Sequence, residues 1–135
     1  MAKKPAGIAA LWLLAACVQP DVARLLEGFM YEKPVLVVLS PAPDDTRLLA
    51  QRQVLKALSE KNLAVIEVIA NQSVRLDGRQ LVQMGTPAFY DYFEADETQF
   101  KAIFIKKDGV ALAPREQSLS DTELTELLAL KGDTY

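Results

Sequence analysis

A short polar stretch follows the most apolar run of the chain and holds the side chains best placed for chemistry. The aliphatic run Val35–Leu39 leads through a turn, Ser40 to Asp45, into a helical pattern that begins at Thr46. Open α/β sheets place their functional sites where a strand ends and the next helix begins. We therefore expect the binding surface at this turn. Its candidate residues are Asp44, Asp45, Arg47 and Gln51.

These residue types do not form a catalytic set. A serine nucleophile at Ser40 needs a general base, and the chain has no histidine. Asp44 or Asp45 could act as that base only with a raised pKa, and both have the position of solvated helix-capping residues. A metal site that joins them to Glu67 lacks any recognised ligand spacing. We expect no catalytic residue, metal or cofactor; a thiol-independent enzyme that uses the turn from Ser40 to Gln51 is the alternative.

Two of the candidate residues allow two interpretations each. Arg47 could hold an anion at the helix start. A cation there opposes the helix dipole, however, and pairing with Asp44 or Asp45 is the simpler account. Gln51 falls on the apolar face of the helix, where a buried amide needs hydrogen-bond partners. It is either satisfied by nearby backbone or part of a polar pocket beside the turn.

The residues around the turn predict a parallel βαβ unit. Val35–Leu39 has the continuous aliphatic pattern of a strand that is buried on both faces. Leucines then recur at helical spacing as far as Leu58. Ala64–Ile69 follows as a second β-branched strand, in which Glu67 indicates a sheet-edge face or a solvent-facing end. Short connections between strand, helix and strand favour a right-handed parallel unit.

The rest of the chain predicts a turn, two helices and two strands. Asp77–Gly78 between alternating apolar residues predicts a projecting β-turn or flap, which we expect to join the contact surface. A helix starts at Thr86-Pro87 with Thr86 as its N-cap. Its aromatic residues Phe89, Tyr92 and Phe93 share a face, for which core packing is favoured over a ligand platform. Further elements are expected at Lys101–Ile105 (strand), Val110–Ala113 (return strand) and from a Ser120–Glu123 capping box to near Gly132 (helix).

Composition excludes several classes of function. The 135 residues suffice for one domain. Without Lys3 and Lys4, which we expect to be removed, 13 basic and 18 acidic residues give a net charge of −5. An acidic domain without a basic stripe argues against a nucleic-acid partner. Cys17 is the only cysteine, so an intramolecular disulfide and a Cys-x-x-Cys redox pair are both excluded.

The first residues have the pattern of an export signal. Two lysines precede Gly7–Val18, an uncharged and largely apolar run of 12 residues. A membrane-spanning helix needs about 20 residues, whereas a signal-peptide core has about this length. We expect residues 1–16 to be the signal peptide, residues 17–32 an N-terminal arm and residues 33–131 the folded domain. Within the arm, Asp21 to Met30 has the pattern of a short amphipathic helix or arm.

The end of this run, Leu14-Ala15-Ala16-Cys17, resembles the lipobox of bacterial lipoproteins. In that family the cysteine thiol receives a diacylglycerol, cleavage occurs before it, and the new amine is acylated. The resemblance implies a membrane anchor at Cys17. Val18 in place of aspartate implies sorting to the outer membrane, on the periplasmic side of the envelope. An ordinary signal peptide that yields a soluble periplasmic or secreted protein is the alternative.

The expected order β-α-β-(α)-β-β-α, with a central mixed sheet flanked by helices, is that of the thioredoxin-like fold. Three stretches also resemble a family of small bacterial domains of unknown function, DUF4174: Val35–Gln53, Phe100–Val110 and Leu119–Leu128. The resemblance implies a thioredoxin-like core without a redox pair, often exported, and it carries over no catalytic residue. We therefore expect a non-redox binding or accessory module at the envelope, with an unknown envelope protein or a small ligand as its partner. A redox-related protein is the alternative.

Overall fold

The computed structural model describes residues 20–58 and 62–130, so the expected signal peptide and Cys17 lie outside the described residues. In this part the chain forms four α-helices and five strands. In chain order they are α2 (Pro20–Glu27), β1 (Val35–Ser40), α3 (Thr46–Ala57), β2 (Ala64–Ile69), β3 (Ser73–Leu76), β4 (Arg79–Gln80), α4 (Thr86–Phe93), β5 (Lys101–Ile105) and α5 (Asp121–Leu128).

The strands form one mixed sheet in the order β4-β3-β2-β1-β5. β1 pairs with β2 in parallel and with β5 in antiparallel orientation, and β3 pairs antiparallel with both β2 and β4. The predicted α/β class is confirmed, and the arrangement is consistent with a thioredoxin-like fold. β1 lies between β2 and β5, and all six of its residues are buried.

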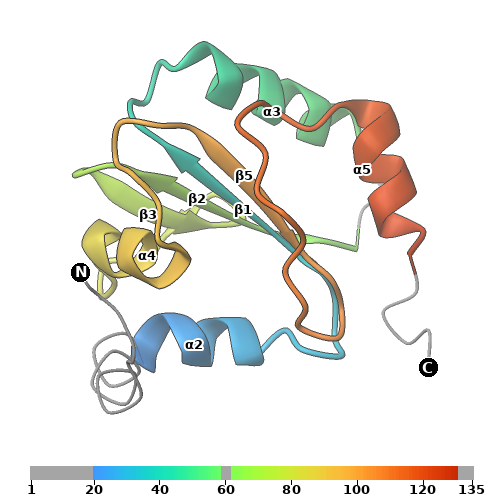
Figure 1. The fold of residues 1–135 in the computed structure, drawn as a ribbon, viewed down its shortest axis with the longest axis horizontal. Helices are drawn as coiled ribbons and strands as arrows, with labels where there is room; N and C mark the ends of the chain where they lie inside the picture. The colour runs from blue at the N-terminus through green and yellow to red at the C-terminus, as the bar shows by residue number, and fades with distance from the viewer. Residues whose placement is uncertain (1–19, 59–61, 131–135) are drawn as a thin grey trace.

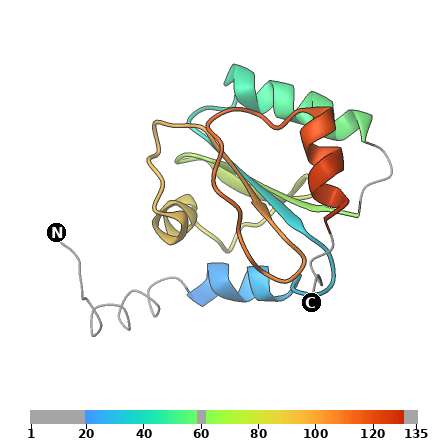
Figure 2. The same cartoon turned by 45° about the vertical axis from the view of Figure 1, so that its right-hand side comes forward.

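Two helices cover each face of the sheet (Figures 1 and 2): α2 and α4 on one face, α3 and α5 on the other. Val35, Val37 and Leu39 of β1 belong to the core cluster on the α2–α4 face. Leu36 and Val38 belong to the cluster on the α3–α5 face. Alternate side chains of a strand point to opposite faces, so a strand covered twice must be apolar throughout. This requirement explains the unbroken aliphatic run.

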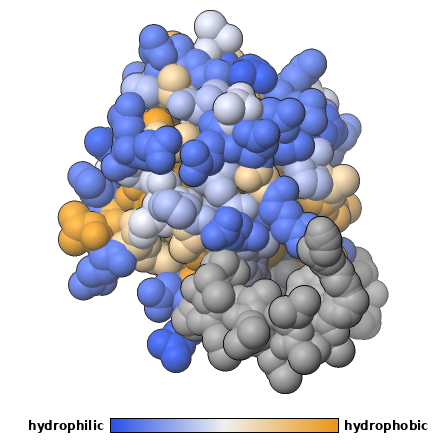
Figure 3. Space-filling model, turned by 60° about the vertical axis from the view of Figure 1, so that its left-hand side comes forward, coloured by the Kyte–Doolittle hydropathy of each residue, from blue (hydrophilic) through white to orange (hydrophobic). Residues whose placement is uncertain are grey.

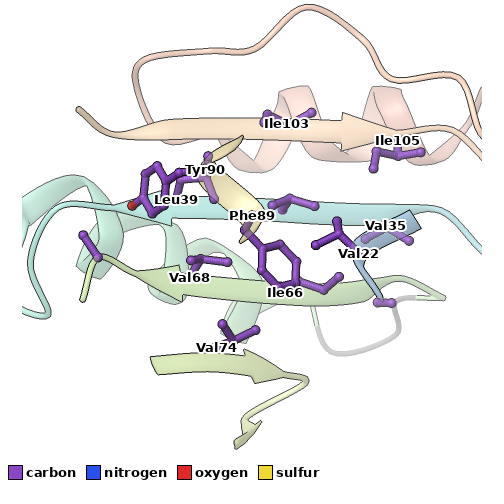
Figure 4. Packing of buried hydrophobic residues seen from close by; sticks show 13 residues of the cluster. Val22, Val35, Leu39, Ile66, Val68, Val74, Phe89, Tyr90, Ile103 and Ile105 are labelled. Atoms are coloured by element: carbon purple, nitrogen blue, oxygen red, sulfur yellow. The ribbon is translucent and has the colours of Figure 1, made fainter. Parts of the chain in front are cut away.

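Helix α2 is part of the domain, which corrects the expected boundary at residue 33. Its Val22 is fully buried in the same cluster as Val35 and Ile105, and Figure 4 shows these side chains on one face of the sheet. Leu25, Leu26 and Phe29 are partly buried against that cluster. Of the two interpretations of this stretch, helix or arm, the helix is confirmed, and it covers part of the core.

The predicted β-turn at Asp77–Gly78 is confirmed, but its strands are part of the sheet, so the turn is not an isolated flap. Both residues have positive φ, 51° and 86°, as a two-residue hairpin turn of type I′ requires. The Asp77 carboxylate accepts a hydrogen bond from the Val65 amide at 2.9 Å. β3 is short, but its pairing with β2 gives it a neighbour that the sequence pattern did not reveal.

Three smaller expectations on the second half of the chain have mixed outcomes. The N-cap of α4 is Gly85 rather than Thr86, whose hydroxyl instead accepts from the Asn71 amide at 3.2 Å. The expected return strand at Val110–Ala113 does not form; Ala111 and Arg115 instead make two isolated bridges to β5. Pro114, between them, has no amide hydrogen to donate to a strand ladder. The Ser120–Glu123 capping box is confirmed.

Helix α4 packs onto the sheet through aromatic side chains. Phe89 is fully buried and Tyr90 is 3% exposed, which confirms core packing for this side of the helix, whereas Tyr92 is 40% exposed. The Tyr90 hydroxyl donates to the Ser40 carbonyl at 3.1 Å. Burial, with a smaller contribution from the negative charge of Glu97, raises the pKa of Tyr90 to about 12.

The buried phenol predicts a loss of stability at high pH. The unfolded chain releases the Tyr90 proton near the ordinary pKa of 10.0, while the folded protein keeps it up to about pH 12. The free energy of unfolding therefore falls as the pH rises from 10 to 12. Tyr90→Phe should lower it by about 1 kcal/mol at neutral pH, through the lost hydrogen bond, and should flatten this pH dependence.

Urea unfolding at pH 8, 10 and 11 measures both effects, with Tyr92→Phe on the exposed side of α4 as the matched control. The free energy of unfolding should fall less steeply with pH in Tyr90→Phe than in the wild type, whereas Tyr92→Phe should change this pH dependence less. The same pH dependence of the free energy of unfolding in the wild type and in Tyr90→Phe would contradict the raised pKa of Tyr90.

Candidate functional site

The turn after β1 is held together by internal hydrogen bonds. Ser40 is fully buried, and its hydroxyl donates to the Ala42 carbonyl at 2.7 Å. The Ser40 carbonyl accepts from the Ala70 amide at 2.9 Å as well as from Tyr90. The hydroxyl and the backbone carbonyl of Ser40 therefore both have hydrogen-bond partners inside the fold. Ser40 is not presented as a nucleophile at the surface.

Asp45 and Arg47 form a closed pair at the start of α3. Asp45 is the N-cap, and its Oδ1 accepts from the Arg47 amide at 2.9 Å and from Arg47 Nε at 3.0 Å. Its Oδ2 accepts from Arg47 Nη2 at 2.8 Å. The Arg47 guanidinium holds the pKa of Asp45 below its ordinary value, and Asp45 in turn raises the pKa of Arg47. The predicted pairing of Arg47 is confirmed for Asp45, while Asp44 is exposed to solvent.

The guanidinium of Arg47 is fixed from a second side by an aromatic ring. Its Cζ lies 5.3 Å from the centroid of Phe100, a fully buried residue directly before β5. Arginine has five N–H donors, and Asp45 takes one from Nε and one from Nη2. Among the described residues the other three have no partner, and the side chain is 41% exposed. Arg47 is thus a rigidly held donor group with an open edge.

Arg47 borders a hollow of about 620 Å³ between α3 and the segment that leads to α5. Thr46, Arg47 and Ala50 line one side of it, and residues 116–118 line the other. Of the charged residues that line it, Arg47 pairs with Asp45 and Glu116 pairs with Lys101 across 3.2 Å. With its charges closed in pairs, the hollow is polar and close to neutral. It suits a partner that offers hydrogen-bond acceptors to Arg47.

Sequence reasoning missed the residues that complete this site. Phe100, Lys101 and Glu116 lie far from Arg47 in the chain, and antiparallel pairing of Leu39 with Lys101 brings the start of β5 beside the turn. The signal that could have found them is the strand prediction itself. A strand that pairs antiparallel with β1 must begin where β1 ends.

Gln51 is buried and does not belong to the binding surface, which corrects its inclusion there. It is 1% exposed. Its Nε2 donates to the Leu119 carbonyl at 3.1 Å, and its Oε1 accepts from the Leu119 amide at 2.7 Å. Of the two interpretations, satisfaction by backbone is confirmed, although that backbone lies 68 residues away in the chain. We call this pair of hydrogen bonds the Gln51–Leu119 clasp.

The expected contact surface also does not extend to the Asp77–Gly78 turn. Asp77 contacts Val65 near the start of β2, whereas Ser40 pairs with Ile69 at the end of that strand. Four residues of strand, about 13 Å, separate the two places. The turn and the hairpin therefore lie at opposite ends of the sheet.

Glu67 is also placed differently from either sequence interpretation. β2 is an interior strand, and Glu67 pairs with Arg52 of α3 across 2.9 Å. Within residues 20–58 and 62–130, no group of three or more potential ligand side chains is arranged to hold a metal ion. The same part of the chain contains no helix whose length and apolar character would let it cross a membrane.

Comparisons with known proteins identified no relative of this chain. No family model, curated protein or solved structure matches the chain. The resemblances to DUF4174 and to lipoprotein signal peptides stay predictions.

The clasp predicts a large difference between two glutamines on one helix. Gln51→Ala leaves the buried amide and carbonyl of Leu119 without partners, each at about 1–3 kcal/mol, and should lower the free energy of unfolding by about 3 kcal/mol. Gln53→Ala, on the exposed side of α3, should change it by less than about 0.5 kcal/mol. Chemical denaturation measures both, and similar values for the two variants would refute the clasp.

Proposed function

We propose that this chain is an exported bacterial envelope protein, anchored through lipidated Cys17 on the periplasmic side of the outer membrane. Its thioredoxin-like domain serves as a non-redox binding module for another envelope component. The anchor is supported by the order of the basic residues, the apolar run and the lipobox-like Leu14–Cys17. The binding role is supported by the hollow beside Arg47.

One observation carries the binding role: Arg47 is held in place on two sides and open on the third. Asp45 and Phe100 fix the plane of its guanidinium, so a partner meets donors that lose little freedom on binding. The open edge borders a hollow of neutral balance. A partner with carbonyl or carboxylate oxygens, such as an extended peptide segment, fits this chemistry.

The non-redox assignment rests on the side chains at the turn. The place where a reactive dithiol would lie, Ser40 to Asp44, contains no cysteine. Ser40 is committed to internal hydrogen bonds, and Asp45 is committed to Arg47. The groups at this turn therefore stabilise the fold or donate hydrogen bonds.

Crosslinking in the intact envelope, followed by pull-down of the full chain, tests the binding role. We expect a defined partner with the wild type and about tenfold less of it with Arg47→Ala, because a hydrogen bond to a charged group contributes about 1.5–3 kcal/mol. Arg52→Ala is the matched control. Arg52 lies on the same helix, is 42% exposed and also pairs with one carboxylate, so this variant should capture the partner as the wild type does.

Both variants should remain folded, with losses of stability below about 1 kcal/mol. Equal loss of the partner in the two variants, or full capture by Arg47→Ala, would contradict a binding surface at Arg47. Thiol-reductase turnover by a Cys17→Ala protein would overturn the non-redox assignment.

A further inference from the structure

The distance between the expected lipid anchor and the folded domain is very short. Only Val18 and Gln19 separate Cys17 from Pro20, the first residue of α2. Three steps of about 3.8 Å along the chain span at most about 11 Å. The headgroup layer of a bilayer leaflet is itself about 5–7 Å thick. A lipidated Cys17 therefore holds the N-terminal end of α2 at the membrane surface.

Helix α2 is fixed to the domain and cannot serve as a spacer. Val22, two residues after the start of α2, is fully buried in the core cluster of the α2–α4 face. Undocking the helix would expose Val22 and the partly buried Leu25 and Leu26 to water, at about 1.5–3 kcal/mol for a large apolar side chain. Helix α2 is thus a rigid part of the folded domain, and the acyl chains on Cys17 would anchor the domain through it.

We propose that the α2–α4 face of the domain lies directly on the lipid headgroups, while the α3–α5 face, with Arg47 and its hollow, points away from the membrane. This inference rests on the lipidation of Cys17 in the proposed function. In Figures 1 and 2, α2 lies on the opposite side of the sheet from α3 and α5. The binding surface is therefore accessible to a partner from the periplasm.

Charge does not attract this face to a membrane. Its exposed charged residues in α2 and α4 and at the end of α4 are mostly acidic: Asp21, Glu27, Asp91 and Glu94, against Arg24. Figure 3, which brings the left-hand side of Figure 1 forward, shows a mostly hydrophilic surface on which hydrophobic residues form small groups. Contact with lipid is thus imposed by the short connection to the anchor. Without acylation the domain should not bind vesicles of neutral or anionic lipid.

The test uses the lipidated full chain in phosphatidylcholine vesicles that carry a headgroup-attached quencher. A fluorophore is placed at Arg24→Cys on the exposed side of α2 or, as the matched control, at Gln53→Cys on the exposed side of α3. We expect at least threefold stronger quenching at position 24. A 20-residue Gly/Ser insertion between Gln19 and Pro20 spans about 25 Å on average and should remove most of this difference.

The outcomes separate the orientation from the anchor. Equal quenching at positions 24 and 53 overturns the orientation. A difference that the insertion leaves unchanged overturns the claim that the short connection to the anchor imposes it. Incorporation of a fatty-acid analogue into the wild type, and its loss in Cys17→Ala, tests the anchor independently. No label on the wild type, or undiminished label on Cys17→Ala, overturns the proposed lipidation itself.

Discussion

The Gln51–Leu119 clasp is the interaction on which the α3–α5 side of the domain depends. One buried amide satisfies both backbone groups of a residue that belongs to no regular element. Leu119 directly precedes the capping box of α5, and Ser118 lines the hollow opposite Ala50, the neighbour of Gln51. The clasp therefore fixes the position of the segment that leads into α5. It also fixes the distance between Arg47 and residues 116–118 on the other side of the hollow. A side chain that looked like part of a binding surface instead sets the geometry of that surface.

The polar side chains of the turn after β1 likewise serve the fold more than a partner. In a thioredoxin-like fold this turn is the place for reactive groups, but here the side chains of Ser40 and Asp45 are both paired inside the fold. Asp45 caps α3 and holds Arg47. The carbonyl of Ser40 accepts hydrogen bonds from the backbone of Ala70, the residue after β2, and from the hydroxyl of Tyr90 in α4. Apart from the exposed Asp44, what is left for a partner is the open edge of the Arg47 guanidinium. This division favours recognition over reaction.

Much of the fold follows from local patterns, whereas much of the site does not. The aliphatic run of β1, the Asp-Gly turn and the Ser120 capping box each encode their structure within a few residues. The Asp45–Arg47 pair was equally predictable because it is local. Gln51 and Leu119 meet across 68 residues, and Phe100 reaches Arg47 only through the pairing of β5 with β1. Such contacts depend on sheet order, which a hydrophobic pattern does not specify. Helix α2 was underestimated because its burial depends on a face of the sheet that forms later in the chain.

Native-state hydrogen exchange at the Leu119 amide tests the clasp most directly. This amide donates to Gln51 across 2.7 Å and lies outside the helices and strands, so the clasp alone accounts for its protection. The account predicts that it exchanges as slowly as the core amides of β1, through global unfolding. Exchange as fast as that of the neighbouring amides at residues 116–118 would contradict the clasp and, with it, the fixed geometry of the hollow.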